Sequence, residues 1–247
     1  TDSVQFAKLS VNNVEGYFFW CGKDKAEIQG TKALEYINWG ENYPIEIKQG
    51  KNTGDYYDGF HQVSSVKSRK RWYDISNRES APVWWMIAHN ERSISVFNDI
   101  DAFSSNNFFE ILPYEYSAIA LSSYLTATIS CFYREILGRS NYGGGLLKTE
   151  KPDLIKFDLL RYELISKDLD KSLPILERKS ESIFKESGIN PESTIPISEQ
   201  EPQPLSDRAE LDNIVFDALG LTDEERKEVY RAVCQLVWNR VSKARSV

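Results

Sequence analysis

From residue 1 to about residue 115, apolar residues come in short runs separated by polar turn residues. The runs are rich in aromatic and β-branched side chains, a composition typical of strands, and they cover residues 4–9, 17–21, 83–88, 94–97 and 108–112. The polar segment 89–92 separates two of these runs, so we expect them to pair as a hairpin. Residues 31–38 have the pattern of a short helix.

The spacing of apolar residues changes between residues 115 and 137. Large apolar residues now recur every three or four positions, which places them on one face of a helix about six turns long; they are Leu121, Leu125, Ile129, Phe132 and Ile136. We expect one long helix that ends at Gly138.

The last third of the chain has three parts. Residues 152–187 alternate apolar and charged groups and are expected to be partly helical, with a break near Pro174. Residues 187–209 hold four prolines among Ser, Glu and Gln and are expected to form an exposed loop. A final helix follows, in which Thr222 and Glu225 fit a capping box and four valines form an i, i+4 stripe: Val229, Val233, Val237 and Val241. The basic residues at its end suit the helix dipole.

These elements predict an α+β fold: a mixed, strand-rich N-terminal part with a long central helix, followed by a helical C-terminal part. We expect a first domain over residues 1–160 and a helical extension over residues 161–247 that includes the Pro-rich loop. No apolar run reaches the roughly 18 residues that a membrane-spanning helix needs.

Charge is unevenly distributed along the chain. The net charge is −7, yet residues 1–151 carry 16 Lys or Arg against 18 Asp or Glu, and the acidic excess falls in residues 152–230. A basic groove is therefore compatible with the acidic total. The three cysteines lack metal-ligand spacing, so we expect buried thiols, a reducing cytoplasm and no metal site.

The segment 138–148 contains three consecutive glycines bracketed by cations and an amide. Its residues are Arg139, Asn141, Gly143, Gly144, Gly145 and Lys148. Glycines give a bare backbone that another molecule can approach, and clustered N–H groups with basic side chains suit phosphate, so the segment predicts nucleic-acid binding. The alternative is a helix C-cap followed by a tight turn.

A second basic segment lies at residues 67–73, where four cations precede Trp72 and Tyr73. We expect Arg69, Lys70 and Arg71 to contact phosphates or major-groove base edges, and the two aromatic residues to pack in the core. The alternative is a solvated basic end of a strand.

Three asparagines suit base recognition, since an Asn side chain can make two hydrogen bonds to adenine; they are Asn98, Asn106 and Asn107. The alternative is that they serve the backbone of turns. Tandem tryptophans at 84 and 85 are expected to be buried strand residues. The sequence lacks the common catalytic motifs of hydrolases, nucleotide-binding enzymes and metalloproteases, which favours binding over catalysis.

Several segments together resemble the C-terminal target-recognition region of adenine-specific DNA methyltransferases from restriction–modification systems, of the Taq-methyltransferase-like kind in which the catalytic domain comes first. Residues 33–41 resemble the "YI..GE" segment, residues 71–74 the "R.WY.L" strand, residues 121–148 the helix and loop ending in "GR..GGG.LK", and residues 216–244 a frequent tail. The usual Asn after Leu121 is missing.

The resemblance implies a partner domain and a DNA partner. In such enzymes a Rossmann-like catalytic domain binds S-adenosylmethionine and carries an Asn/Asp-Pro-Pro-Tyr/Phe motif that holds the extruded adenine. This motif does not occur here and the sequence starts without Met, so we expect a recognition part of a methyltransferase, with or without a fused endonuclease, that binds double-stranded DNA. The alternatives are a specificity subunit acting in trans and a protein-interaction domain.

Overall fold

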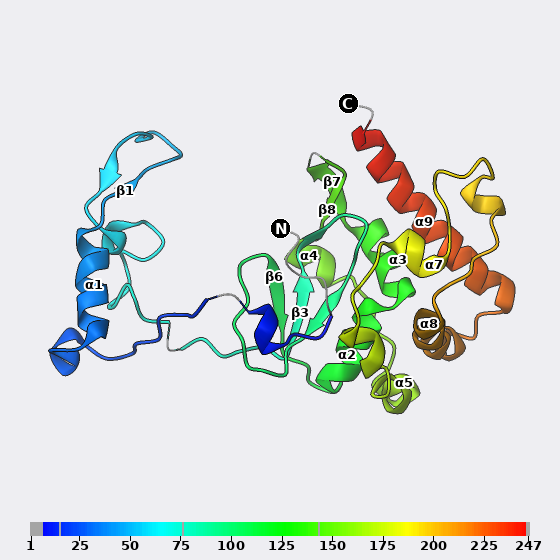
Figure 1. Ribbon diagram of the computed structural model, residues 1–247, viewed down its shortest axis with the longest axis horizontal. Coiled ribbons are helices and arrows are strands. Elements are labelled where there is room, and N and C mark those ends of the chain that lie inside the picture. The colour runs from blue at the N-terminus through cyan, green and yellow to red at the C-terminus, as the bar shows by residue number, and fades with distance from the viewer. Residues whose placement is uncertain (1–6, 15, 76, 143, 246–247) are drawn as a thin grey trace. The chain divides into compact units, whose positions relative to one another are not determined.

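The computed structural model describes residues 7–14, 16–75, 77–142 and 144–245, and Figure 1 labels its elements. The chain divides into two compact units. Unit 2 is the continuous segment Gly16–Glu79, and unit 1 comprises Thr1–Glu15 and Ser80–Val247. The fold is α+β, as predicted. The expected division at residue 160 stays a prediction.

Unit 2 is built around the helix α1 (Lys32–Asn42), whose N-cap Thr31 accepts a hydrogen bond from the backbone of Leu34. Around it lie two short 3₁₀ helices, η2 (Lys25–Ile28) and η3 (Phe60–Gln62), and a two-stranded antiparallel sheet of β1 (Ile45–Glu46) and β2 (Tyr56–Tyr57). The strand expected at residues 17–21 does not form. There Phe19 instead packs on the Tyr36 ring of α1, at 4.7 Å between centroids.

Two of the motif segments meet in the core of unit 2. A Cβ at Gly40 would lie 2.6 Å from the Trp72 ring, so only glycine leaves room for that indole. The indole N–H donates to the carboxylate of Glu41 (3.1 Å), and the ring stacks on Phe60. Tyr73 is buried beside them. The core packing expected for Trp72 and Tyr73 is therefore confirmed.

Unit 1 contains two three-stranded antiparallel sheets. One has the order β5-β3-β6, formed by β3 (Val83–Met86), β5 (Ser95–Phe97) and β6 (Phe108–Ile111). The other has the order β4-β8-β7, formed by β4 (Ala88–His89), β7 (Arg139–Tyr142) and β8 (Leu146–Lys148). Trp85 pairs with Ser95, which confirms the expected hairpin. From the N-terminal run, Lys8 pairs with Phe97 in parallel, while residues 4–6 lie outside the described residues.

Side chains of β3 alternate between two apolar clusters. Val83 and Trp85 face the main core that the helices form, whereas Trp84 packs against Leu9 and Val96 on the other face. Both tryptophans are buried, as predicted. Alternation of this kind fixes the register of a strand, because a slip of one residue would exchange the two faces.

The single helix expected over residues 115–137 is wrong, because the segment forms α2 (Ala118–Thr126) and α3 (Thr128–Leu137) with a break at Ala127. Ala127 is extended, with φ −58° and ψ 153°. The buried carboxylate of Asp212 accepts hydrogen bonds from the backbone N–H and the hydroxyl of Thr128 (2.7 and 2.6 Å). Arg208 donates to the carbonyl of Thr126 (2.6 Å). A distant helix therefore satisfies the backbone groups that the break exposes.

Both of those side chains come from α8 (Ser206–Leu219). Before it, residues 151–187 form short helices, in agreement with the expected partial helicity: α4 (Lys151–Leu154), α5 (Tyr162–Leu169), α6 (Leu173–Glu177) and α7 (Ile183–Ser187). The Pro-rich loop is irregular apart from η4 (Ile197–Glu199). It is less exposed than expected, because Ile189 and Ile197 are buried in the main core.

The final helix, α9 (Asp223–Arg245), lies beside α3 and α7 in unit 1 (Figure 1). The expected capping box is confirmed: the carboxylate of Glu225 accepts from the backbone of Thr222 (2.8 Å), and the Thr222 hydroxyl accepts in return (3.4 Å). Three of the four stripe valines are buried, and Val229 packs against them. The three cysteines are buried free thiols, as expected. Among the described residues, no helix has the length and apolarity to cross a bilayer.

Candidate nucleic-acid interface

Ile87 joins the two sheets of unit 1. Its N–H donates to the carbonyl of Asn107 (2.9 Å), at the turn before β6, and its carbonyl accepts from the N–H of Thr149 (2.8 Å), just after β8. One residue of the chain thus fixes the 105–107 turn on one side and the end of β8 on the other. Side chains of the 105–107 turn and of β8, which belong to different sheets, therefore lie near one another.

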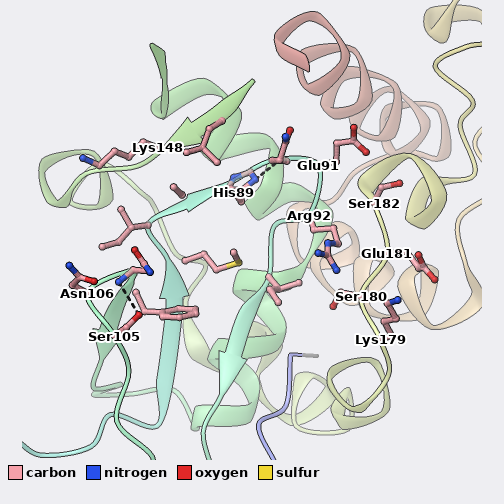
Figure 2. A pocket seen from close by; sticks show the side chains of 18 residues that line it. His89, Glu91, Arg92, Ser105, Asn106, Lys148, Lys179, Ser180, Glu181 and Ser182 are labelled. Atoms are coloured by element: carbon pink, nitrogen blue, oxygen red, sulfur yellow. Dashed lines mark hydrogen bonds between the residues drawn. The ribbon is translucent and has the colours of Figure 1, made fainter. Parts of the chain in front are cut away.

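A concavity of about 1120 Å³ opens there, shown from close by in Figure 2. Its walls are the end of β3, β4 and the segment that follows it, the 105–108 turn, β8, and the connection 179–182 before α7. Its polar side chains include Asn106, Lys148 and Arg92, which Figure 2 labels. The concavity therefore combines amide and cationic side chains on strands that are hydrogen-bonded to one another.

The side chains that line the concavity carry a slight excess of positive charge. Arg92, Lys148 and Lys179 line it together with Glu91 and Glu181. Glu181 is itself held by Lys185 (2.9 Å). Burial holds the pKa of His89, which also lines the concavity, well below its usual range, and the charges of Arg134 and Arg240 act in the same direction. His89 is therefore a neutral ring at physiological pH.

The glycine run forms the turn of the β7–β8 hairpin. Gly144 and Gly145 have φ values of 71° and 70°, in the left-handed region that favours glycine. Gly144 is exposed and a Cβ there would meet open space, whereas a Cβ at Gly145 would lie 3.1 Å from the Cα of Val241 in α9. The turn thus presents one glycine outward and seats another under α9. Gly143 lies outside the described residues.

The two cations of this hairpin are direct partners across β7 and β8, where Arg139 faces Lys148. Residues paired in this way carry their side chains on the same face. The Arg139 side chain is 51% exposed and lies 3.3 Å from Asp153, and that of Lys148 is 33% exposed and lies 3.0 Å from Glu150. The carboxylate of Asp153 is buried, but both cations keep part of their own surface exposed, so a phosphate can approach each of them. Only the backbone of Asn141 is described, within β7.

Two buried arginines outside the predicted site hold this region together. Arg134, fully buried on α3, donates to the carbonyl of Met86 (2.6 Å) and to the hydroxyl of Thr149 (3.3 Å). Burial lowers its pKa to about 10, which leaves it charged at neutral pH. Arg240 on α9 pairs with Glu135 (2.7 Å) and donates to the carbonyl of Gly145. These contacts fix the hairpin to α3 and α9.

In unit 2 the second basic segment surrounds a depression of about 600 Å³, lined by Arg69, Lys70, Arg71 and Arg78 together with Asp74, Ile75 and Asn77. Arg69 is exposed, and the Lys70 side chain is 78% exposed and lies 3.5 Å from Asp24. Arg71 is held more firmly, by Asp24 (3.0 Å) and Asp74 (2.6 Å).

The three candidate asparagines separate into two kinds. Asn98 is buried, and its amide bonds to the backbone carbonyls of Ala81 and Ala102 (both 2.9 Å) and to the N–H of Ala102 (3.0 Å). It therefore stabilises a loop, and the base-reading hypothesis is wrong for it. Asn106 and Asn107 are exposed and line the concavity of unit 1.

The described residues contain no group of three His, Cys, Asp or Glu side chains placed to hold a metal ion.

Comparison with known proteins identifies the family. A family model described as the C-terminal domain of the type II methyltransferase M.Eco57I matches residues 2–173, well over half of the chain. No curated protein and no solved structure matches it. The matched residues include three of the four motif segments, so the expected resemblance to the C-terminal region of a methyltransferase is confirmed. The chain belongs to the family of type II methyltransferase C-terminal domains represented by M.Eco57I.

Proposed function

We propose that this chain is the target-recognition part of an adenine-specific DNA methyltransferase of a restriction–modification system. In this role it binds duplex DNA and holds it while a catalytic domain, in cis or in trans, extrudes and methylates the base. The observation that carries the proposal is the β7–β8 hairpin, which pairs Arg139 with Lys148, and Lys148 in turn lines a concavity that also contains asparagine amides.

Local charge supports the hairpin as the phosphate-binding element. Residues 139–156 carry four Lys or Arg against two Asp or Glu, whereas unit 1 as a whole carries 20 against 28. One of the two acids, Asp153, is buried, and its pKa is lowered chiefly by the backbone N–H of Glu150 and also by Arg139. The exposed charge around the hairpin is therefore mainly positive, as a phosphate-binding surface requires.

Each glycine of the turn has its own part in this proposal. Gly144 lets the DNA backbone come close to the exposed turn, and Gly145 keeps the turn seated on α9. Gly143 and Asn141 are proposed for the same phosphate-binding role on the sequence alone.

In unit 2, Arg69 and Lys70 are the cations placed to contact phosphate, since their side chains are exposed. Arg71 contributes to the same positive surface, and its hydrogen bonds to Asp24 and Asp74 hold the segment in place.

The part of the chain that the structure describes does not fit S-adenosylmethionine. Domains that bind dinucleotide-like cofactors place them at the ends of parallel strands, beside a Gly-rich turn that opens a helix. Here every pair of strands in the described residues is antiparallel, and the Gly-rich turn joins two strands of a hairpin. This supports assigning the cofactor to the catalytic domain.

Binding of a fluorescently labelled duplex, followed by anisotropy, tests the proposed function. We expect the Arg139→Ala/Lys148→Ala double variant to bind more than tenfold more weakly than the wild type, because at least two charge-assisted phosphate contacts are lost. Arg69→Ala/Lys70→Ala should also weaken binding. The matched control is Lys171→Ala, which removes an exposed lysine paired with Asp168 at 2.9 Å, as Lys148 is paired with Glu150.

Unchanged affinity in the hairpin variant would remove the hairpin from the interface. A wild-type chain that ignored duplex DNA and instead bound a protein partner would favour the interaction-domain alternative.

A further inference from the structure

The turn that precedes β6 is held rigidly by hydrogen bonds of its backbone and of Ser105, and its asparagine side chains take no part in them. The N–H of Phe108 donates to the carbonyl of Ser105 (3.3 Å), and the N–H of Asn107 donates to the hydroxyl of Ser105 (3.4 Å). The carbonyl of Asn107 accepts from Ile87 (2.9 Å), which ties the turn to the joint between the two sheets. Ser105 therefore makes the side-chain contact that stabilises the turn.

The ordinary reasons for asparagine in a turn do not apply to Asn106 or Asn107. One reason is tolerance of left-handed backbone, but Asp101 is the only non-glycine with positive φ in the described part of the chain. The other is a hydrogen bond from the side chain to the backbone, and neither amide makes one within the described residues. Asn98, eight residues earlier, shows the contrast, because its amide is fully used by the backbone.

The side-chain amides of Asn106 and Asn107 thus make no hydrogen bond within the described residues, while hydrogen bonds hold the backbone that carries them. Both asparagines line the concavity with Lys148 and Arg92, and Figure 2 shows Asn106 next to Ser105 on the wall facing β8. Because Ile87 bonds both Asn107 and Thr149, the distance from the turn to the end of β8 is fixed by backbone hydrogen bonds. A duplex whose phosphates contact the hairpin would bring its base edges to this wall.

We propose that Asn106 and Asn107 are specificity-determining residues that read adenine in the major groove. The inference rests on the proposed function and names the part of the interface that discriminates sequence. Asparagine matches adenine because its amide N–H donates to N7 while its carbonyl accepts from the N6 amino group. A rigid turn suits this role, since the amide position is fixed before DNA arrives.

The test is selection from a duplex pool with a randomised central segment. The full 247-residue chain binds the pool, and sequencing of the bound fraction gives the preference at each base pair. In the wild type we expect adenine to be enriched at one or two neighbouring positions. Asn106→Ala and Asn107→Ala should each lower that preference by about 5-fold to 150-fold at one position. The control Asn239→Ala removes an exposed amide from α9, outside the concavity.

Aspartate at the same positions provides a second readout. Asn106→Asp and Asn107→Asp keep the shape and the acceptor but lose the donor, so adenine enrichment should fall and cytosine enrichment should rise at the affected position. Affinity for non-selected sequences and its dependence on salt should stay the same in the alanine variants, because phosphate contacts are untouched.

The two proposals fail in distinguishable ways. If the wild type binds duplexes and its base preference survives both alanine substitutions, or if it shows no preference at any position, the asparagine assignment is overturned while the proposed function stands. If the wild type binds no duplex at all, both are overturned.

Discussion

Charged side chains in the interior of unit 1 are matched by partners at hydrogen-bond distance. Glu186, with 3% of its side chain exposed, accepts from Arg178 at 2.6 Å and from Arg208 at 3.1 Å. Burial alone would raise the pKa of Glu186, but the hydrogen bond from Arg178 and the charge of Arg208 outweigh it and lower the pKa to about 2. The carboxylate is therefore much more acidic in the folded chain than in the unfolded one.

This shift predicts a loss of stability in acid. Because the folded pKa lies below the ordinary value of 4.5, the contribution is fully present above about pH 5 and is lost as the pH falls toward 2. A shift of this size corresponds to roughly 3 kcal/mol. Urea unfolding across this pH range should show a weaker pH dependence for Glu186→Gln than for the wild type. The exposed control Glu35→Gln should follow the wild type, and identical pH profiles for all three would contradict the assignment.

Single residues differ in how well their roles could be predicted from sequence. Arg240 lies seven positions after Val233 and so shares the buried face of the valine stripe, a signal that its place among the basic residues at the helix end obscures. No such signal marks Arg134, because its partners, Met86 in β3 and Thr149 just after β8, lie 48 and 15 residues away in the sequence. Gly40 is similar, since the need for glycine arises only when Trp72 packs against α1.

At the scale of elements, the break between α2 and α3 depends on one carboxylate. Asp212 is completely buried and accepts from the N–H and hydroxyl of Thr128 and from the hydroxyl of Tyr230 (2.9 Å). It thus caps the N-terminus of α3 from another helix, where a negative charge also suits the helix dipole.

We predict that Asp212→Ala lowers the free energy of unfolding by about 3 kcal/mol or more, because buried donors lose their acceptor. Chemical denaturation measures this change. Asp168→Ala, which removes an exposed carboxylate paired with Lys171, should cost less than about 1 kcal/mol. Equal effects of the two substitutions would show that the break is held by other contacts.

The two glycines of the β7–β8 turn should differ in how much their replacement lowers the free energy of unfolding. Gly144→Ala should cost about 1–2 kcal/mol, since the left-handed backbone is strained but the site is open. Gly145→Ala should cost more, because the new Cβ also meets α9 at 3.1 Å. Thermal unfolding of the two variants gives the comparison. Equal stabilities would mean that the turn is not seated on α9.

Local signals predicted the elements that local contacts stabilise. The capping box at Thr222, the valine stripe of α9 and the pairing of β3 with β5 are visible in the sequence because their partners are near in the chain or recur at a regular spacing. The interruption at Ala127 is not visible, because Asp212, which binds Thr128 there, lies 84 residues beyond Thr128. The strand expected at residues 17–21 fails for a similar reason: Phe19 packs on the Tyr36 ring of α1, while Tyr17 and Trp20 remain exposed, and no neighbouring strand pairs with the segment in the described part of the chain.

At the scale of the whole molecule, the motif segments occur in both units. In unit 2 the first two segments form a common core around Trp72 and Gly40, and in unit 1 the Gly-rich segment forms the hairpin beside the concavity. Unit 2 carries 10 Lys or Arg against 9 Asp or Glu, so the acidic total of the chain comes from unit 1. Within unit 1 the hairpin and the segment after it, residues 139–156, carry an excess of positive charge, so an interaction of this segment with phosphate should depend on salt.

Salt dependence of duplex binding is the most direct test of that interaction. We predict that the logarithm of the association constant falls linearly with the logarithm of salt concentration, with a slope of roughly −0.9 for each phosphate contacted. Lys148→Ala should make the slope less negative by about 1, and Lys171→Ala should leave it unchanged. Undetectable binding, binding that does not change with salt, or the same slope in wild type and Lys148→Ala would contradict the assignment of the hairpin to DNA phosphates.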